Sequence, residues 1–230
     1  MTPNPGLTIF IPVYNEEYLL VKNTLHLLAF LDSLELPYEV ILGSNGSTDK
    51  TVKLAKELSR KYEAVHFFHM TQKGVGLAFR EGLGMATHDR IITVDMDLSI
   101  SLDFIPAAYH LLNHTDMVIG SKTTGEQQRS WSRKLASNLF IRLARYLLQI
   151  NFNDYSIAAK GYRKTLAKRY LDHIDDKTFY VVEIAHRASR DGCRLQEIPV
   201  KCTDLRESRF NLIHEGIYKF GHLFRLWLKP

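Results

Sequence analysis

Two aspartates, one residue apart, stand at the end of an apolar run near the middle of the chain. Asp95 and Asp97 follow Ile91–Val94, a run that is typical of a buried strand. In open α/β sheets, ligands bind at the carboxyl ends of the strands. Carboxylate oxygens on a short turn suit Mg²⁺ or Mn²⁺, ions that usually lie between carboxylates and substrate phosphates. The pair therefore predicts a metal site, although an isolated Asp-x-Asp also fits a strand end followed by a helix cap.

Three further segments could contact a nucleotide. Pro12–Glu16 leaves the first apolar run with a proline and polar side chains, which fits a nucleotide pocket or a plain helix start capped by Asn15. Gly43–Asp49 is rich in small residues that let the backbone approach a ligand, or that simply form a turn. Lys73–Ala78 places a lysine and two glycines at an expected helix entrance, where backbone amides attract anions. Each segment alone fits an ordinary turn as well as a binding site.

The elements that would position these residues alternate between strand and helix patterns over the first 120 residues. The expected strands are Leu7–Val13, Tyr38–Gly43, Val65–His69, Arg90–Asp95 and Met117–Gly120. The expected helices are Glu16–Leu34, Asp49–Tyr62, Gly74–Ala86 and Asp103–Asn113. Alternation of this kind predicts an α/β fold with a mostly parallel, Rossmann-like sheet flanked by helices.

The pattern changes after Gly120. A long helix is expected over Arg133–Ile150, a strand near Ser156–Tyr162, a helix near Val181–Arg190 and a strand near Leu195–Lys201. The apolar side of the long helix is expected to hold Leu135, Leu139, Leu143, Tyr146, Leu147 and Ile150.

The C-terminal segment Phe210–Leu228 has the pattern of a basic amphipathic helix. Its apolar stripe consists of Phe210, Ile213, Ile217, Phe220, Phe224 and Trp227, and its other face holds His214, Lys219, His222 and Arg225. Such a helix is expected to lie on a membrane surface, or else to pack on the sheet or on a second subunit. We therefore divide the chain into an α/β domain, residues 1–209, and an amphipathic tail, residues 210–230.

Composition narrows the class of protein. Of 230 residues, 45% are hydrophobic and 24% charged, which is ordinary for a folded globular protein. No apolar stretch approaches the roughly 20 residues that span a bilayer, and the N-terminus lacks a signal-peptide pattern. The two cysteines match no metal spacing, so a reducing cytoplasm is expected. The segment from Lys122 to Arg145 contains six basic residues and a single acidic one. No nucleic-acid motif accompanies them, so the expected anionic partner is a phosphorylated small molecule or an anionic membrane.

In this order, the segments resemble the inverting nucleotide-sugar glycosyltransferases of the GT-A fold, glycosyltransferase family 2. The subgroup they are most similar to is the dolichol-phosphate or polyprenyl-phosphate mannose and glucose synthases. The resemblance covers nearly the whole chain. It is carried by Pro12–Glu16, Gly46–Asp49, Lys73–Ala78, Asp95-x-Asp97-Leu98, Gly120–Lys122, Arg133-x-x-x-Ser137, Phe179-x-x-x-Glu183-Ile184, Glu197–Val200 and Arg206–Arg209.

The resemblance implies transfer of mannose or glucose from a GDP- or UDP-sugar to a polyprenyl or dolichyl phosphate, with inversion and with Mg²⁺ or Mn²⁺. It implies a peripheral enzyme at the cytoplasmic face of a membrane. The implied nucleotide-binding residues are Pro12, Tyr14, Glu16, Ser44, Asn45, Lys73, Asp95 and Met96. The implied metal ligands are Asp95, Asp97 and Ser99, and the implied acceptor-phosphate residues are Lys122, Arg133 and Ser137. Asp97, Arg206 and Arg209 would act in catalysis, the two arginines by steadying the leaving diphosphate.

The chain departs from the family pattern at four of these positions. Ser44 and Asn45 replace two acids, the first of which contacts the base, so the identity of the base is open. Ser99 replaces a Gln that reaches the metal, and Lys122 replaces an Arg. Two alternatives follow: a glycosyltransferase acting on a sugar hydroxyl, with Glu183 as the candidate base, or a nucleotide-sugar binding protein that has lost catalysis.

Overall fold

A single seven-stranded sheet forms the centre of the molecule. The computed structural model describes residues 5–122, 131–155, 157–203 and 212–228, with the backbone alone for 131–137 and 212–215. The strand order is β3-β2-β1-β4-β6-β5-β7. The strands are β1 (Leu7–Val13), β2 (Tyr38–Asn45), β3 (Val65–Met70), β4 (Arg90–Thr93), β5 (Met117–Ser121), β6 (Lys160–Arg163) and β7 (Leu195–Pro199). Every pairing is parallel except those of β6, which runs antiparallel to both β4 and β5.

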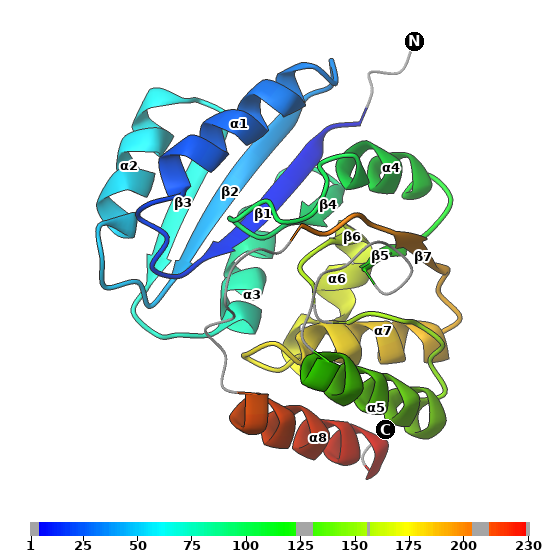
Figure 1. Cartoon of the computed structure of the whole chain (residues 1–230). Helices are drawn as coiled ribbons and strands as arrows, with labels where there is room; N and C mark the ends of the chain where they lie inside the picture. The colour runs from blue at the N-terminus through cyan, green and yellow to red at the C-terminus, as the bar shows by residue number, and fades with distance from the viewer. Residues whose placement is uncertain (1–4, 123–130, 156, 204–211, 229–230) are drawn as a thin grey trace.

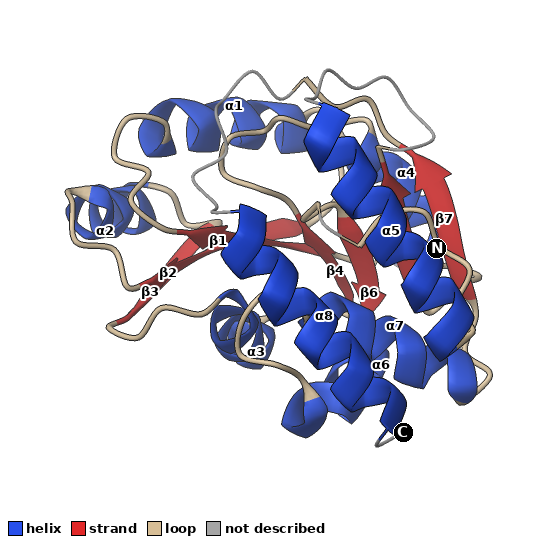
Figure 2. Ribbon diagram, turned by 60° about the horizontal axis from the view of Figure 1, so that its bottom comes forward, coloured by secondary structure: helices blue, strands red, loops and turns tan. Residues whose placement is uncertain are grey.

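Helices cover both faces of this sheet. They are α1 (Leu20–Asp32), α2 (Thr51–Lys61), α3 (Val75–Met85), α4 (Phe104–Leu111), α5 (Trp131–Leu148), α6 (Lys164–Tyr170), α7 (Tyr180–Arg190) and α8 (Leu212–Leu228), with a short 3₁₀ helix at Leu171–His173. One hydrophobic core lies under α1, α2 and α4, and a second lies under α3, α6 and α7. The helices α5 and α8 pack against each other beside the second core (Figures 1 and 2). The predicted α/β fold, with its mostly parallel sheet, is confirmed.

The central strands form because their side chains are buried on both faces. Every residue of β1 except Pro12 is buried, and in β2 only Tyr38 is not. Near-continuous apolar runs of this kind are typical of parallel strands covered by helices on each side. At the start of β1, the Thr8 hydroxyl donates to Glu39 Oε1 at 2.6 Å. This contact gives a buried carboxylate a partner where the two strands begin side by side.

Several element boundaries differ from the prediction, and one difference matters for the site. The strand β4 ends at Thr93, so Asp95 lies beyond it instead of inside it. The Val94 backbone N–H still donates to the Phe10 carbonyl at 3.2 Å, after which the chain turns. Leu98 closes this turn in the left-handed region, with φ 49°. That conformation costs a non-glycine residue about 1–2 kcal/mol, so the turn is held in place by its surroundings.

Two other predictions about elements were wrong. The helix α1 begins at Leu20 instead of Glu16, and therefore Asn15 does not cap it. The strand expected near Ser156–Tyr162 begins only at Lys160, and the helix α6 that follows it was not predicted.

The buried faces of α5 and α8 agree with the predicted ones only in part. In α5, Ile141, Ala144 and Leu148 are buried. Of the predicted apolar side, Leu143, Leu147 and Ile150 pack in the second core, whereas Leu139 and Tyr146 are exposed. In α8, Leu223 and Leu226 are buried in the second core. Ile217, Phe224 and Trp227 of the predicted α8 stripe are exposed, by 72%, 44% and 47%. Both helices carry apolar residues on more than one side, so periodicity alone identified the packed side only in part.

The proposed boundary between the domain and the tail, at residue 209, falls in a segment outside the described residues. Within the described part of the chain, no helix is long and apolar enough to cross a membrane.

Candidate functional site

The turn Asp95–Leu98 lies at the carboxyl edge of the sheet, directly after β4. The Leu98 backbone N–H donates to the Asp95 carbonyl at 3.1 Å, which closes the turn. The Asp97 carboxylate accepts the Ser99 backbone N–H at 3.0 Å. Asp97 also lines a surface cavity of about 490 Å³ between this turn and α1. The cavity leaves the Asp97 carboxylate reachable from solvent, as a metal ligand must be.

The two carboxylates of this turn influence each other electrostatically. Burial, and then the charge of Asp97, raise the pKa of Asp95 to about 6. The Ala158 backbone N–H donates to the Asp95 carboxylate and favours its charged form. A divalent cation bound here would offset the repulsion between the carboxylates. The donor set of this turn therefore fits Mg²⁺ or Mn²⁺.

The described side chains do not enclose such an ion by themselves. Among the residues that the structure describes, no group of three or more His, Cys, Asp or Glu side chains converges to hold a metal. Magnesium-type sites commonly use one or two carboxylates together with water and substrate phosphates. The geometry therefore fits a cation that arrives with a phosphorylated ligand.

A network of buried charges lies behind the aspartates. Lys122 and Asp154 are almost fully buried, and the Lys122 ammonium lies 3.9 Å from Asp154 Oδ2. Lys160 is fully buried, and its Nζ donates to the Ile157 carbonyl at 2.8 Å. Burial lowers the pKa of Lys160 to about 8, although the charge of Asp154 opposes that shift. Glu197 of β7 accepts the Asp154 backbone N–H at 3.2 Å.

Asp154 and Lys160 were not predicted as site residues. One signal was present, because Lys160 interrupts the apolar pattern between Ile157 and Tyr162. A charged residue inside a buried strand needs a partner, and that partner marks a polar site.

The residues after β1 meet the turn after β2. The Asn15 Oδ1 atom accepts the Thr48 backbone N–H at 2.8 Å, and the Asn15 backbone N–H donates to Ser47 Oγ at 3.2 Å. The Glu16 backbone N–H donates to Thr51 Oγ1 at 2.8 Å. Asn15 itself has φ 52°, a left-handed conformation that Asn adopts more readily than most residues. These bonds hold the predicted Pro12–Glu16 segment against the second strand end.

Tyr14 and Lys73 come together at this edge. The Lys73 Nζ atom lies 3.7 Å from the centre of the Tyr14 ring, a cation–π contact. Pro12, Tyr14 and Glu16 are partly exposed, and Lys73 is exposed. These four residues can therefore contact a ligand from solution.

Three other predicted nucleotide residues lie behind the surface. Ser44 is fully buried, and its hydroxyl lies 3.0 Å from His69 Nδ1. The buried Asn45 amide donates to the Val13 carbonyl at 3.1 Å and accepts the Gly74 backbone N–H at 3.4 Å. The Met96 side chain is buried in the first core. Their positions do not support direct contact with a nucleotide, because their side chains are packed or bonded within the protein.

The glycines of the Lys73–Ala78 segment serve packing and do not form an open anion site. A Cβ atom added to Gly74 would lie 2.6 Å from the Asp176 carbonyl oxygen, and one added to Gly76 would lie 2.0 Å from the Asp175 carbonyl oxygen. The Leu77 backbone N–H donates to the Asp176 carbonyl at 3.1 Å. The start of α3 is therefore covered by a protein loop, and the anion-binding interpretation is wrong for it.

The predicted acceptor-phosphate residues are only partly described. Lys122 is buried against Asp154, so it does not contribute to the expected basic surface. Arg133 and Ser137 lie on α5, one helical turn apart, at positions where the backbone alone is described. Arg206 and Arg209 lie outside the described residues.

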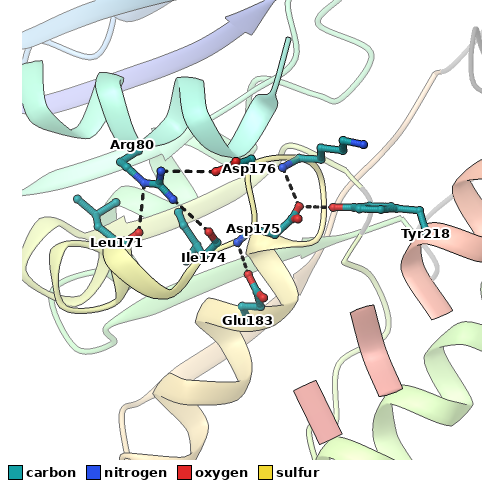
Figure 3. Close-up of polar contacts among 8 residues, drawn as sticks. Arg80, Leu171, Ile174, Asp175, Asp176, Glu183 and Tyr218 are labelled. Carbon is teal, nitrogen blue, oxygen red and sulfur yellow. Dashed lines mark hydrogen bonds and ion pairs between the residues drawn. The ribbon is translucent and has the colours of Figure 1, made fainter. Parts of the chain in front are cut away.

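Glu183, the candidate base, is used inside the protein. Its Oε2 atom accepts the Asp175 backbone N–H (Figure 3). Burial raises the pKa of Glu183 to about 7. The carboxylate therefore organises the segment before α7, and this contact does not favour the sugar-hydroxyl alternative.

Known proteins share both the sequence pattern and the fold. The family described as Glycosyl transferase family 2 matches residues 8–171. The undecaprenyl-phosphate 4-deoxy-4-formamido-L-arabinose transferase of Edwardsiella ictaluri (strain 93-146) is 27% identical over 211 residues. That match covers 90% of this chain but 63% of the relative, so the chain spans less than two thirds of the relative's length.

Two solved structures of glucosyl-3-phosphoglycerate synthase from Mycobacterium tuberculosis have the same fold. The complex with Mn²⁺, UDP and phosphoglyceric acid has a TM-score of 0.72 at 13% identity, covering 98% of this chain and 79% of that one. The complex with UDP has a TM-score of 0.69 at 16% identity, covering 98% and 81%. The predicted GT-A architecture is confirmed, and mannose or glucose specificity stays a prediction. Because the family pattern covers more than half of the chain, the protein belongs to glycosyl transferase family 2.

Proposed function

We propose that the protein transfers mannose or glucose from a GDP- or UDP-sugar to a polyprenyl or dolichyl phosphate. The transfer would invert the configuration at the anomeric carbon. The observation that carries this proposal is the Asp95–Asp97 pair at the sheet edge, beside a cavity open to solvent. The relative from Edwardsiella ictaluri is named for transfer to undecaprenyl phosphate, which supports the acceptor class.

In this proposal Asp95 and Asp97 hold Mg²⁺ or Mn²⁺, with Ser99 nearby. The cation supplies charge that stabilises the departing nucleoside diphosphate. Tyr14, Lys73, Pro12 and Glu16 form the exposed wall against which the nucleotide lies. Ser44, Asn45 and Met96 support that wall from behind.

Arg206 and Arg209 are proposed to bind the leaving diphosphate. The residues that precede them in the chain support this proposal. The Thr203 backbone N–H donates to the Ser99 carbonyl at 2.7 Å, and Cys202 forms an antiparallel bridge with Ile100. Three residues of chain span at most about 10 Å. Arg206 follows Thr203 by three residues in the sequence, which agrees with the proposed role.

The acceptor phosphate is proposed to bind Arg133 and Ser137 on α5. A phosphate monoester is already an anion at neutral pH, so its attack needs no strong general base. The absence of a need for a base agrees with the position of Glu183, because its carboxylate already accepts the Asp175 backbone N–H. The task of the protein is to hold the anion beside the anomeric carbon.

A donor panel tests this function directly. GDP-mannose, UDP-glucose and related donors would be incubated with Mn²⁺ and a short polyprenyl phosphate, and lipid-linked sugar would be measured. Matched reactions would contain EDTA, or the alcohol form of the polyprenyl chain. Transfer that needs both the metal and the phosphate supports the proposal. Equal transfer to the alcohol would favour a hydroxyl acceptor, and nucleotide binding without any transfer would favour a binding protein.

Metal affinity should depend on pH because Asp95 must lose its proton to bind a cation. Its pKa is raised to about 6, above that of an ordinary carboxyl group. We expect Mn²⁺ affinity to be constant above that pH and to fall roughly tenfold per pH unit below it. Calorimetric titrations between pH 7.5 and pH 5 would measure this. A flat profile would contradict the assignment of Asp95 as a ligand.

The exposed apolar side of α8 is proposed to contact a membrane surface. Ile217, Phe224 and Trp227 are exposed there. The exposed Arg225 of the same helix can meet anionic lipid headgroups. Charges at mid-bilayer cost about 2.5–3.5 kcal/mol each on insertion scales, so the helix would lie in the interface.

Replacing all three exposed residues, Ile217, Phe224 and Trp227, by Ser should release the chain from anionic liposomes in a flotation assay. The matched control replaces two exposed apolar residues of α1, Val21 and Leu25, by Ser. Equal flotation of the two variants would contradict the proposed membrane surface.

A further inference from the structure

The loop formed by residues 171–179 connects α6 to α7 and is clamped to α3. Arg80 of α3 donates to the Leu171 carbonyl at 3.2 Å and to the Ile174 carbonyl at 3.1 Å. Its guanidinium also lies 3.5 Å from Asp176 Oδ1 (Figure 3). One side chain thus fixes three points of the 171–179 loop to α3.

The same loop rests on the first turn of α3. The Asp176 carbonyl accepts the Leu77 backbone N–H at 3.1 Å. Only glycine fits at positions 74 and 76, because an added Cβ atom would lie 2.6 Å and 2.0 Å from loop carbonyl oxygens. A shift of the loop must therefore move or loosen the first turn of α3.

On its other side the loop is fastened to α8 through Asp175. The Tyr218 hydroxyl donates to the Asp175 carboxylate (Figure 3). The same carboxylate accepts the Lys177 backbone N–H at 2.7 Å and the Phe179 backbone N–H at 3.3 Å. His222 Nδ1 lies 3.7 Å from it. The Asp175 side chain is only 9% exposed, so these partners compensate a nearly buried charge.

The first turn of α3 in turn meets the wall proposed to bind the nucleotide. The Gly74 backbone N–H donates to Asn45 Oδ1 at 3.4 Å. The preceding residue, Lys73, places its ammonium over the Tyr14 ring. An unbroken series of contacts therefore runs from Tyr218 of α8, through Asp175 and the loop, to Lys73 and Tyr14.

We propose that Tyr218 and Asp175 are positioning residues for the nucleotide: docking of α8 on the 171–179 loop holds Lys73 in place against Tyr14. The inference rests on the proposed function in taking the Tyr14–Lys73 wall as the donor site. It adds that the helix with the exposed apolar surface controls how well that wall is formed.

The test uses Tyr218→Phe in the full chain. This change removes the hydroxyl that bonds to Asp175 and keeps the ring that packs on His222, whose centroid lies 4.5 Å away. The matched control is Tyr146→Phe on α5, a tyrosine that is 81% exposed. We expect faster hydrogen exchange at Leu77 and roughly three- to tenfold weaker binding of UDP or GDP with Mn²⁺. Neither quantity should change in the control.

Arg80→Gln loosens the loop from the opposite side and should give the same two changes. Both variants act through one loop. The double variant should therefore bind nucleotide with about the same affinity as the single variant that binds it more weakly. Unchanged exchange at Leu77 in Tyr218→Phe, or faster exchange with unchanged nucleotide affinity, would overturn the inference. If the losses of nucleotide-binding free energy in the two single variants added fully in the double variant, the two residues would not act through the same loop. If the wild-type chain bound neither UDP nor GDP, the proposed function would be overturned instead. Hydrogen exchange at Leu77 would still show whether Tyr218 stabilises the first turn of α3.

Discussion

Asp97→Ala is expected to abolish metal-dependent sugar transfer. Asp97 reaches solvent at the cavity beside α1, and it is proposed to bind the cation that offsets charge on the leaving diphosphate. Loss of such a cation removes several kcal/mol of transition-state stabilisation, which corresponds to roughly a thousandfold or more in rate. Product formation with saturating Mn²⁺ would be measured by chromatography.

The fold of that variant should persist, because a partly exposed carboxylate contributes little packing. Thermal unfolding should therefore stay within a few degrees, or about 1 kcal/mol, of the wild type. Asp103→Ala, at an exposed position shortly after the site, is the matched control and should retain full activity. If Asp97→Ala still turned over in a metal-dependent way, the metal would be bound elsewhere.

Arg133→Ala is expected to impair use of the acceptor far more than binding of the donor. A charge-assisted phosphate contact is worth about 1.5–3 kcal/mol, or roughly ten- to a hundredfold in affinity. The apparent KM for the polyprenyl phosphate should rise by this factor, while the nucleotide Kd stays constant. Steady-state kinetics with varied acceptor, combined with calorimetry for the nucleotide, would separate the two.

The control for that experiment is Arg142→Ala, which removes an exposed base from the same helix. It should leave acceptor use unchanged if the effect belongs to position 133. Loss of nucleotide affinity in Arg133→Ala, with unchanged acceptor kinetics, would place α5 beside the donor instead.

The sequence was most informative where burial and chemistry coincide. The strand β1 could be predicted because a parallel strand covered on both faces must be apolar along nearly its whole length. Asp95 and Asp97 could be assigned to the carboxyl edge because they follow a run of the same kind. Local patterns of this type need no knowledge of distant parts of the chain.

The sequence was least informative where a distant segment decides the role of a residue. Gly74 and Gly76 have the spacing of an anion-binding turn, yet the loop at Asp175 and Asp176, about a hundred residues later, covers them. Lys122 was predicted to belong to a basic surface, but in the structure it is buried beside Asp154. Partners of this kind come from tertiary pairing, which no local pattern encodes.

The helix α8 illustrates the same limit for packing. Its predicted apolar stripe and the Leu223–Leu226 pair are both apolar, and the positions of α5 and of the 171–179 loop determine which side is buried. The outcome leaves the aromatic residues Phe224 and Trp227 exposed on the outer side of the helix.

The position of β6 has a consequence for synthesis of the chain on the ribosome. Since β6 lies between β4 and β5, the strand that pairs with the edge of β4 opposite β1 emerges after β5. Until Arg163 has left the exit tunnel, the nascent β4 presents an unpaired edge, and unpaired edges promote aggregation. The Ala158 amide that bonds to Asp95 arrives in the same late segment. Folding during synthesis therefore completes the Asp95–Leu98 turn only after the first five strands have been made.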